Sequence, residues 1–296
     1  MLTNLNNSVY HCQEPRAKSQ EPRAKSQLCS LLKFKSCISG IIKNIFLVLF
    51  KKAHIRYLLK HKNFKNFPIY IISFNRLSYL KQMVGWLKKY GYKNINIIDN
   101  KSDYPPLLEY YKNCGCKIIY MNKNYGHNVF YISKKFLFTR LFKFYILTDP
   151  DLAPVENLPA DFVEQFLKIM LEYPKVCKVG FSLKIDDIPD EYNLKDVVIK
   201  FESGFWQKTL KHFTENYKIY YAPIDTTFTL DTPKIYPRPF TGIRTGYPYQ
   251  VRHLPWYRIK NDNENENYLK SKLNTTGNYN GELTGEELLK RFNFSD

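Results

Sequence analysis

A regular alternation of short apolar runs and helical patterns between residues 68 and 149 constrains this chain most. Apolar, β-rich runs lie at 68–75, 94–99, 116–121 and 143–149. Amphipathic helical patterns lie between them, at 77–90, 107–113 and 130–141, and Gly91 is placed to end the first one. Such alternation predicts βαβ units with right-handed crossovers, and therefore an α/β fold with a mostly parallel sheet flanked by helices.

The pattern becomes less regular after residue 151. We expect a helix at 161–172, strands at 176–183, 218–222 and 226–230, and a last helix at 284–292. Residues 238–255 are rich in Pro, Gly and Tyr and predict little regular structure, and the polar run 261–267 predicts a mobile segment.

Composition excludes several classes of protein. Hydrophobic residues make up 44% and charged residues 24%, which is inconsistent with collagen, a coiled coil or wholesale disorder. No run of 18 apolar residues occurs, which argues against a polytopic membrane protein. Cys114 and Cys116 lack a second pair or a nearby His, so we interpret them as reduced thiols. With no secretory-signal pattern at the start, we expect a cytoplasmic protein.

The net charge of +18 is concentrated near the start of the sequence. Residues 1–67 carry a net charge of +11, and the remaining residues carry only +7. A nucleic acid, an anionic membrane face or an acidic substrate would suit such an arm, and a merely solvated basic face is the alternative. We disfavour nucleic acid because no recognisable binding motif is present and the charge does not cover a domain face.

Polar residues cluster where the four predicted strands end. They are Ser73, Asn75 and Arg76, then Asp99 and Asn100, then Asn124 and Gly126, and finally Asp149 and Asp151. Ligands of open α/β sheets bind beyond the carboxyl ends of the strands, so these loops predict one shared binding site. Asx residues are also common in turns, which is the alternative explanation for each of them taken alone.

The Asp-Pro-Asp sequence at 149–151 is the most informative motif. Two carboxylates directly after a buried strand can face one cleft and hold Mn²⁺ or Mg²⁺ through oxygen ligands. A cation there would neutralise a diphosphate and stabilise it as a leaving group. A turn in which an Asp caps the following helix is the alternative.

The order YIISFNR, NIIDNKS, NYGH and YILTDPD resembles the nucleotide-sugar-binding half of a GT-A glycosyltransferase of the family-two type. The resemblance covers residues 68–155 and extends only loosely beyond them. It implies that Asp149 and Asp151 bind the metal. It also implies that the nucleotide sugar is bound by Ser73, Asn75, Arg76, Asp99, Asn100, Asn124, Gly126 and Asp149. Pro150 departs from the pattern because its backbone carries no N–H for the ligand.

The resemblance also implies roles for residues in the second half. His253 is the candidate third metal ligand, since imidazole and carboxylates together suit Mn²⁺ or Mg²⁺. The family places an acidic general base near the acceptor; this chain has no clean Glu-Asp pair after the motif, so Asp225 is the substitute and Glu202 its rival. For His253 and Asp225, a hydrogen-bonded loop histidine and a turn carboxylate are the alternatives.

The resemblance, with the residues that carry it, implies a metal-dependent, inverting glycosyltransferase that moves a sugar from a nucleotide-diphosphate sugar, favoured as a UDP-sugar, to a glycan or lipid-linked acceptor of a bacterial surface. A membrane-attached nucleotide-sugar-binding protein without catalysis and a basic nucleic-acid-binding protein are the alternatives. The predicted segments are a disordered tail with a duplicated EPRAKSQ (1–27), a basic amphipathic helical segment (28–65), a catalytic domain (66–260) and a polar tail with a short helix (261–296).

Within the catalytic domain we expect a donor half at 66–155 and an acceptor half at 156–260. The segment 28–62 mixes Leu, Ile, Phe and Val with Lys and Arg. It would either lie at the anionic surface of the inner membrane, which makes the protein peripherally associated, or pack on the domain as a structural helix.

Overall fold

The computed structural model describes residues 44–210, 217–236, 242–257 and 263–271. The chain divides into two compact units, Met1–Phe46 and Leu47–Asp296, and the second unit carries the features discussed below. The tail predicted at 1–27, residues 28–43 and the helix predicted at 284–292 lie outside the described residues.

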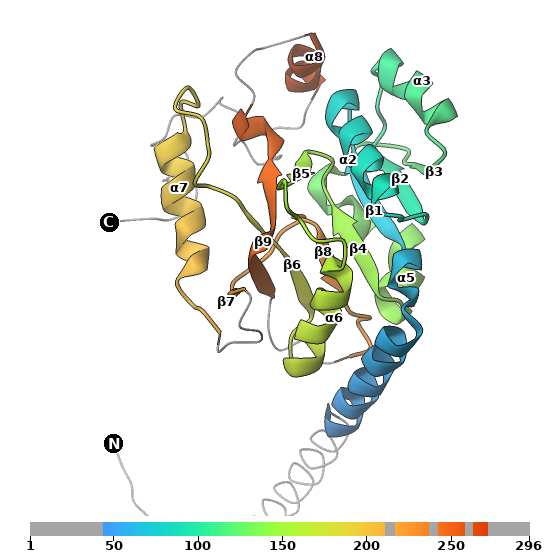
Figure 1. The fold of residues 1–296 in the computed structure, drawn as a ribbon. Helices are drawn as coiled ribbons and strands as arrows, with labels where there is room; N and C mark the ends of the chain where they lie inside the picture. The colour runs from blue at the N-terminus through green and yellow to red at the C-terminus, as the bar shows by residue number, and fades with distance from the viewer. Residues whose placement is uncertain (1–43, 211–216, 237–241, 258–262, 272–296) are drawn as a thin grey trace, which may run out of the picture. The chain divides into compact units, whose positions relative to one another are not determined.

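The described residues form a nine-stranded mixed sheet (Figure 1). Its first part holds β1 (Ile69–Ser73), β2 (Ile95–Asp99), β3 (Lys117–Tyr120) and β4 (Tyr145–Thr148), which pair in parallel in the order β3-β2-β1-β4. The α/β class and these four strands are confirmed. The parallel part follows the alternation seen in the sequence, because a helical crossover follows each of β1, β2 and β3.

The second part of the sheet is mostly antiparallel, so the sheet is mixed and not mostly parallel as predicted. It contains β5 (Leu152–Pro154), β6 (Lys178–Leu183), β7 (Ile219–Tyr221), β8 (Thr229–Asp231) and β9 (Ile243–His253). The order continues β4-β8-β6-β9-β5, with β7 also paired to β9, and only β6 and β9 run parallel. The reversal begins at β8, which pairs antiparallel with both β4 and β6.

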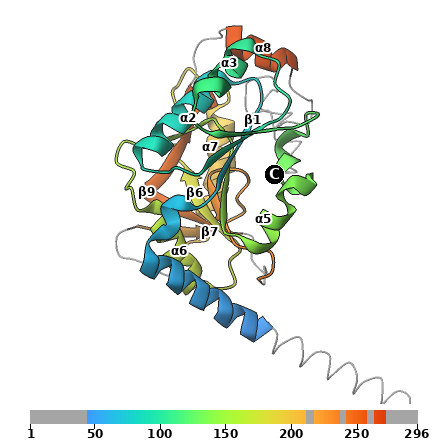
Figure 2. The ribbon, with the colours of Figure 1, turned by 90° about the vertical axis from the view of Figure 1, so that its right-hand side faces the viewer.

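Helices cover both faces of the sheet (Figure 2). On one face lie α2 (Leu77–Lys89), α3 (Pro105–Asn113) and α6 (Phe162–Glu172), whose apolar sides join the larger core. On the other face α4 (Val129–Ile132), η3 (Lys134–Phe136) and α5 (Leu137–Phe142) enclose a smaller core. Residues of β1 alternate between the two cores, as the period of a strand requires.

Local chemistry explains where two of these helices end or break. Gly91 has a φ of +84° after α2, and the N–H groups of Gly91 and Tyr92 donate to Lys88 and Leu87, which is a Schellman cap. The prediction of a single helix at 130–141 is wrong. Ser133 adopts an extended backbone (φ −75°, ψ 132°) and splits the segment into α4, η3 and α5.

One further prediction for the second half is wrong. The segment 238–255, predicted to be irregular, contains β9, which spans 11 residues. Its register with β6 shifts between Phe181 and Ser182, and this bulge takes up Gly246 and Pro248 without ending the strand. Residues 263–267 of the predicted polar segment 261–267 belong to α8 (Asn263–Ser271). The helix α7 (Lys195–Ser203) was not predicted.

Residues 47–61 are helical and pack on the domain. Lys51 is fully buried, and its Nζ donates to the carbonyl oxygens of Pro174 (3.1 Å) and Val176 (2.5 Å). His54 Nδ1 lies 2.9 Å from the hydroxyl of Tyr236. The inner side of this helix therefore agrees with the alternative in which the segment packs on the domain as a structural helix. Its outer side still exposes Leu49, Phe50, Arg56, Tyr57 and Lys60.

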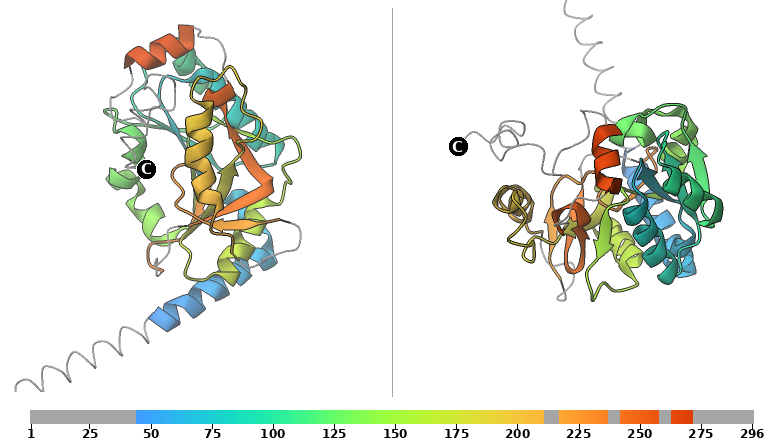
Figure 3. Two further views of the ribbon diagram at one scale, coloured as in Figure 1. Left: turned by 90° about the vertical axis from the view of Figure 1, so that its left-hand side faces the viewer. Right: turned by 90° about the horizontal axis from the view of Figure 1, so that it is seen from above.

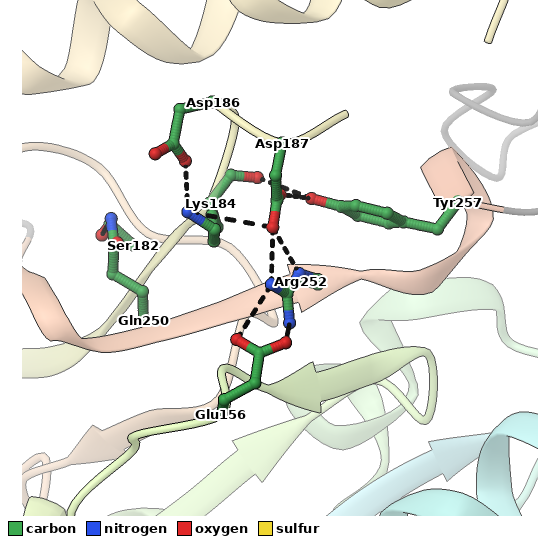
Figure 4. Close-up of polar contacts among 8 residues, drawn as sticks. All are labelled: Glu156, Ser182, Lys184, Asp186, Asp187, Gln250, Arg252 and Tyr257. Carbon is green, nitrogen blue, oxygen red and sulfur yellow. Dashed lines mark hydrogen bonds and ion pairs between the residues drawn. The ribbon is translucent and has the colours of Figure 1, made fainter. Parts of the chain in front are cut away.

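A charged cluster fastens the end of β9 to its neighbours (Figure 4). Arg252 makes a bidentate contact with Glu156 (2.8 and 3.0 Å) and also donates to Asp187 (2.7 and 2.5 Å). Tyr257 donates to Asp187 as well (2.5 Å). Burial alone would raise the pKa of Asp187, but these hydrogen bonds hold it below its usual value. The cluster joins the segment after β5, the end of β9 and the loop after β6.

No helix in the described part of the chain has both the length and the apolar character needed to cross a membrane.

Candidate active site

A cavity of about 460 Å³ lies beyond the carboxyl ends of β1 and β4. The predicted residues that line it are Arg76, Asn100, Asn124, Gly126, Asp149, Asp151, Glu202, Asp225 and His253. The structure therefore brings together side chains from both halves of the chain. Ser73, Asn75 and Asp99 are the predicted site residues that do not line this cavity.

Asp149 follows β4 and is held by the strand-connecting segment that precedes β8. Its N–H donates to the carbonyl oxygen of Thr226 (3.0 Å), and its carboxylate accepts a very short hydrogen bond from the Thr226 hydroxyl. Burial raises the pKa of Asp149 above its usual value, and the nearby Asp151 carboxylate raises it further.

Asp151 is placed beside His253 by strand pairing. Leu152 of β5 is directly opposite His253 of β9, so the residue before β5 reaches the imidazole, with 3.5 Å between Asp151 Oδ2 and His253 Nε2. Burial alone would raise the pKa of Asp151, but His253 and Arg76 together lower it below the usual value. Asp151 Oδ1 and His253 Nδ1 are buried and have no hydrogen-bond partner among the described residues.

Arg76 supplies positive charge to the same cavity. Its side chain is almost completely buried, and Nη1 has no hydrogen-bond partner within the described part of the chain. The guanidinium lies on the ring of Tyr268, 3.9 Å from the centroid, and 4.9 Å from that of Tyr79. A buried guanidinium with an unpaired N–H that lines a cavity is suited to an anionic ligand.

The turn after β3 is organised by Asn100 and Asn124. Asn100 Nδ2 donates to the Gly126 carbonyl (3.0 Å), and its Oδ1 accepts from the N–H of Tyr125 (2.9 Å). Asn124 Oδ1 accepts from the N–H of Gly126 (2.8 Å), whose φ of +65° suits glycine. Both asparagines make hydrogen bonds within this turn and also line the cavity.

Asn75 and Asp99 hold the loops beneath the site. Asn75, at a φ of +46°, accepts from the N–H groups of Asp103 and Tyr104 (2.9 and 3.1 Å) and donates to the Asp103 carboxylate (2.7 Å). Asp99 accepts from the N–H of Ser102 (3.3 Å), and Tyr111 Oη lies 3.0 Å from Asp99 Oδ1 and 3.1 Å from Ser73 Oγ. In this structure these groups are engaged within the protein.

The two candidate bases have different surroundings. Asp225 is exposed and lines the cavity near Asp149. Glu202 is buried and forms an ion pair with Arg244, with 2.8 Å between Oε2 and Nη1. Burial raises the pKa of Glu202, although the Arg244 charge opposes that change. The arrangement favours Asp225 as the accessible carboxylate and gives Glu202 a partner within the protein.

The lining residues that the sequence did not predict include Thr226, Arg244 and Tyr268. Tyr268 belongs to α8, which lies beside the N-terminal end of α2 (Figure 3), where Glu264 accepts from the N–H and hydroxyl of Ser78. The signal available in the sequence was the charge order of α8. Acidic residues occupy its first turn and Lys270 its last, as the helix dipole favours.

The described residues contain no group of three or more His, Cys, Asp or Glu side chains arranged to hold a metal ion. Asp151 and His253 nevertheless fit part of a metal site, because both have a buried atom without a partner. Mg²⁺ in phosphate-binding sites is usually held by one or two carboxylates together with the oxygens of the substrate. A metal at this position would therefore take its remaining ligands from the substrate and from water.

No protein-family model matches this chain, and a search of curated proteins gives no significant match.

Proposed function

We propose that the protein is a metal-dependent glycosyltransferase with a GT-A type fold. It would transfer a sugar from a nucleotide-diphosphate sugar, favoured as a UDP-sugar, to a glycan or lipid-linked acceptor in the synthesis of a bacterial surface polysaccharide or lipooligosaccharide. The observation that carries the proposal is the pairing of β5 with β9, which places His253 beside Asp151 in a cavity at the carboxyl end of β4.

The donor side of the cavity supports binding of a diphosphate. Arg76 presents a buried guanidinium with an unpaired N–H, and Asn100 and Asn124 line the same wall. Guanidinium groups bind phosphate oxygens through charge-assisted hydrogen bonds. Ser73, Asn75 and Asp99 remain proposed parts of the donor site, acting through the loop positions that they hold.

Asp151 and His253 are the residues that would hold Mn²⁺ or Mg²⁺, with Asp149 as their neighbour. Such a cation, when bound, would stabilise the negative charge that develops on the departing diphosphate. The low pKa of Asp151 keeps its carboxylate ionised and able to act as a ligand. Asp149, with its raised pKa and its Thr226 hydrogen bond, is better suited to a secondary role.

Asp225 is the proposed general base. An acceptor hydroxyl would attack the anomeric carbon and transfer its proton to the Asp225 carboxylate as the bond to the diphosphate oxygen breaks, which inverts the configuration. Exposure at the cavity allows Asp225 to reach an incoming acceptor. Glu202 lacks this freedom because Arg244 already occupies its carboxylate.

The segment 28–62 is the proposed contact with the anionic inner-membrane surface, where a lipid-linked acceptor would lie. The exposed Leu49, Phe50 and Tyr57 share one side of the described helix with Arg56 and Lys60. Apolar and basic groups on one helical face are typical of reversible interfacial binding.

The decisive experiment measures hydrolysis of UDP-sugars without acceptor, with Mn²⁺ and with a chelator. We expect Mn²⁺-dependent release of UDP, and a loss on the order of 10²-fold in Asp151→Ala, comparable to the loss of other electrostatic stabilisers. Asp190→Ala is the matched control, since the Asp190 side chain is 95% exposed and lies outside the cavity.

Two results would contradict the proposal. One is turnover in Asp151→Ala that equals turnover in the control. The other is failure of UDP with Mn²⁺ to raise the melting temperature of the intact chain, because a ligand that binds only the folded state must stabilise it.

A further inference from the structure

A second surface with mixed apolar and basic character lies on α4, α5 and the segment 234–235, and we call it the α5 face. Its apolar members are 41–63% exposed: Ile132, Leu137, Phe138, Phe142 and Ile235. None of its residues lines the cavity, so this surface is separate from the site of the proposed reaction.

The fold forces these side chains outward. The segment 129–142 turns Phe130, Phe136 and Thr139 inward, where both aromatic rings join the smaller core and Thr139 bonds to Tyr70. The opposite side of α5 therefore presents Phe138 and Phe142, whose ring centroids are 5.2 Å apart. Figure 2 shows α5 on the side of the sheet away from α2.

The segment 234–235 extends the surface next to α5. The N–H of Lys234 donates to the carbonyl of Arg140 (2.8 Å), and the N–H of Ile235 donates to that of Leu141 (3.3 Å). These backbone bonds place the exposed Ile235 beside the last turn of α5.

All charged residues of this surface are basic. Lys134, Lys135, Lys143 and Lys234 are exposed, and the segments 129–143 and 232–236 contain no Asp or Glu. Lys143 Nζ lies 5.6 Å from the centroid of the Phe138 ring. A protein partner that buried this surface would have to cover several lysines together with the aromatic rings, which interface cores disfavour.

We propose that the α5 face is a membrane-binding surface that inserts Phe138 and Phe142 into the headgroup region of an anionic bilayer. Aromatic side chains enter the interface while the surrounding lysines remain at the level of the anionic headgroups. The charge complementarity identifies the occupant as an anionic lipid surface. This contact is distinct from the one assigned to residues 28–62 and would give the domain a second attachment point.

The first test is cosedimentation of the full chain with vesicles of phosphatidylglycerol and phosphatidylcholine at increasing salt. The double variant Phe138→Ser and Phe142→Ser should reduce the partition coefficient about tenfold or more, because two aromatic rings lose their burial. Lys134→Glu with Lys135→Glu should produce a similar loss and flatten the salt dependence. Tyr247→Ser is the matched control, since Tyr247 is 58% exposed and outside the α5 face.

The second test locates the contact directly. In the Phe138→Trp variant of the full chain, brominated lipids should quench the tryptophan fluorescence, and addition of vesicles should shift its emission to shorter wavelength. In Tyr247→Trp, neither change in the tryptophan fluorescence should exceed that of the parent. Vesicle binding of the serine variant within twofold of the parent, or no additional quenching in Phe138→Trp, would overturn the proposal. So would a dimer that dissociates in the serine variant without any dependence on vesicles, since a second copy would then occupy the surface. UDP binding, measured by calorimetry in the same variants, reports on the proposed function separately.

Discussion

Replacing Glu202 by Gln tests whether this carboxylate stabilises the fold or performs catalysis. The Glu202 and Arg244 side chains are 6% and 5% exposed, and their ion pair joins α7 to β9. Arg244 also donates to the carbonyl of Pro223 (2.9 Å) and lies 4.1 Å from the centroid of Phe205. The Gln variant retains the shape of the side chain but leaves the guanidinium without a countercharge.

The expected cost follows from that unpaired charge. Removing one partner of a buried ion pair destabilises a protein by about 3–5 kcal/mol, because the remaining charge stays buried. In a domain of this size each kcal/mol lowers the melting temperature by about 2–4 °C, so Glu202→Gln should lose roughly 6–20 °C. Adding Arg244→Met removes the orphaned charge, and the double variant should therefore recover part of the lost stability.

Urea unfolding and calorimetry of the parent, both single variants and the double variant give the coupling free energy. Glu109→Gln is the control, because Glu109 pairs with Lys112 at the surface and its side chain is 63% exposed. A Glu202→Gln variant within about 1 kcal/mol of the parent, or a double variant that shows the full sum of the single losses, would refute the structural role. Loss of turnover in a folded Glu202→Gln, with turnover retained in Asp225→Asn, would make Glu202 the base.

Three further predictions concern stability. Asp99→Ala should cost about 1–3 kcal/mol in urea unfolding, because the buried Tyr111 hydroxyl and the Ser102 N–H lose their acceptor; unchanged stability would point instead to a ligand contact. Burial lowers the pKa of His54 below 6.5, so the unfolded chain takes up a proton before the folded chain does as the pH falls. Stability should then decrease below about pH 6.5 by up to about 1.4 kcal/mol per pH unit, and His54→Leu should lose this part of the slope in unfolding measured from about pH 7 to about pH 5. A Cβ at Gly180 would lie 2.8 Å from the carbonyl oxygen of Phe228, so Gly180→Ala should destabilise the sheet by about 1–3 kcal/mol, whereas Gly85→Ala, in open space on α2, should stabilise by up to about 1 kcal/mol in the same assay.

The parallel part of the sheet was predictable because its signals are local. Each strand of 68–149 is a short apolar run, and each helix carries its own periodicity and end signals, such as the Gly91 cap. The break at Ser133 was not predictable in the same way. Residues 130–141 have helical periodicity throughout, but the break at Ser133 lets Phe130 of α4 and Phe136 of η3 both join the smaller core, and Thr139 of α5 then bonds to Tyr70.

β9 could not be predicted because its stability comes from partners far away in the sequence. Gly246 and Pro248 indicate a turn when the segment is considered alone. In the folded chain β6, β7 and β5 all pair with this strand, and the bulge opposite Phe181 and Ser182 takes up both residues. Tertiary hydrogen bonding overrides the local signal here, as β-propensity depends strongly on context.

The same difference between local and distant signals divides the candidate site. The Asp-Pro-Asp motif is a local feature, and its position after β4 could be predicted from the apolar run that precedes it. The different surroundings of its two carboxylates could not, since Asp149 bonds to Thr226 and Asp151 faces His253 only after β8 and β9 have joined the sheet. His253 lies 102 positions after Asp151 in the sequence, and the pairing of Leu152 with His253 makes the two residues neighbours. A change that shifts the register of β9 should therefore separate His253 from Asp151 and abolish the proposed metal site, while the parallel part of the sheet stays folded, because the hydrogen bonds of β1 to β3 do not involve β9.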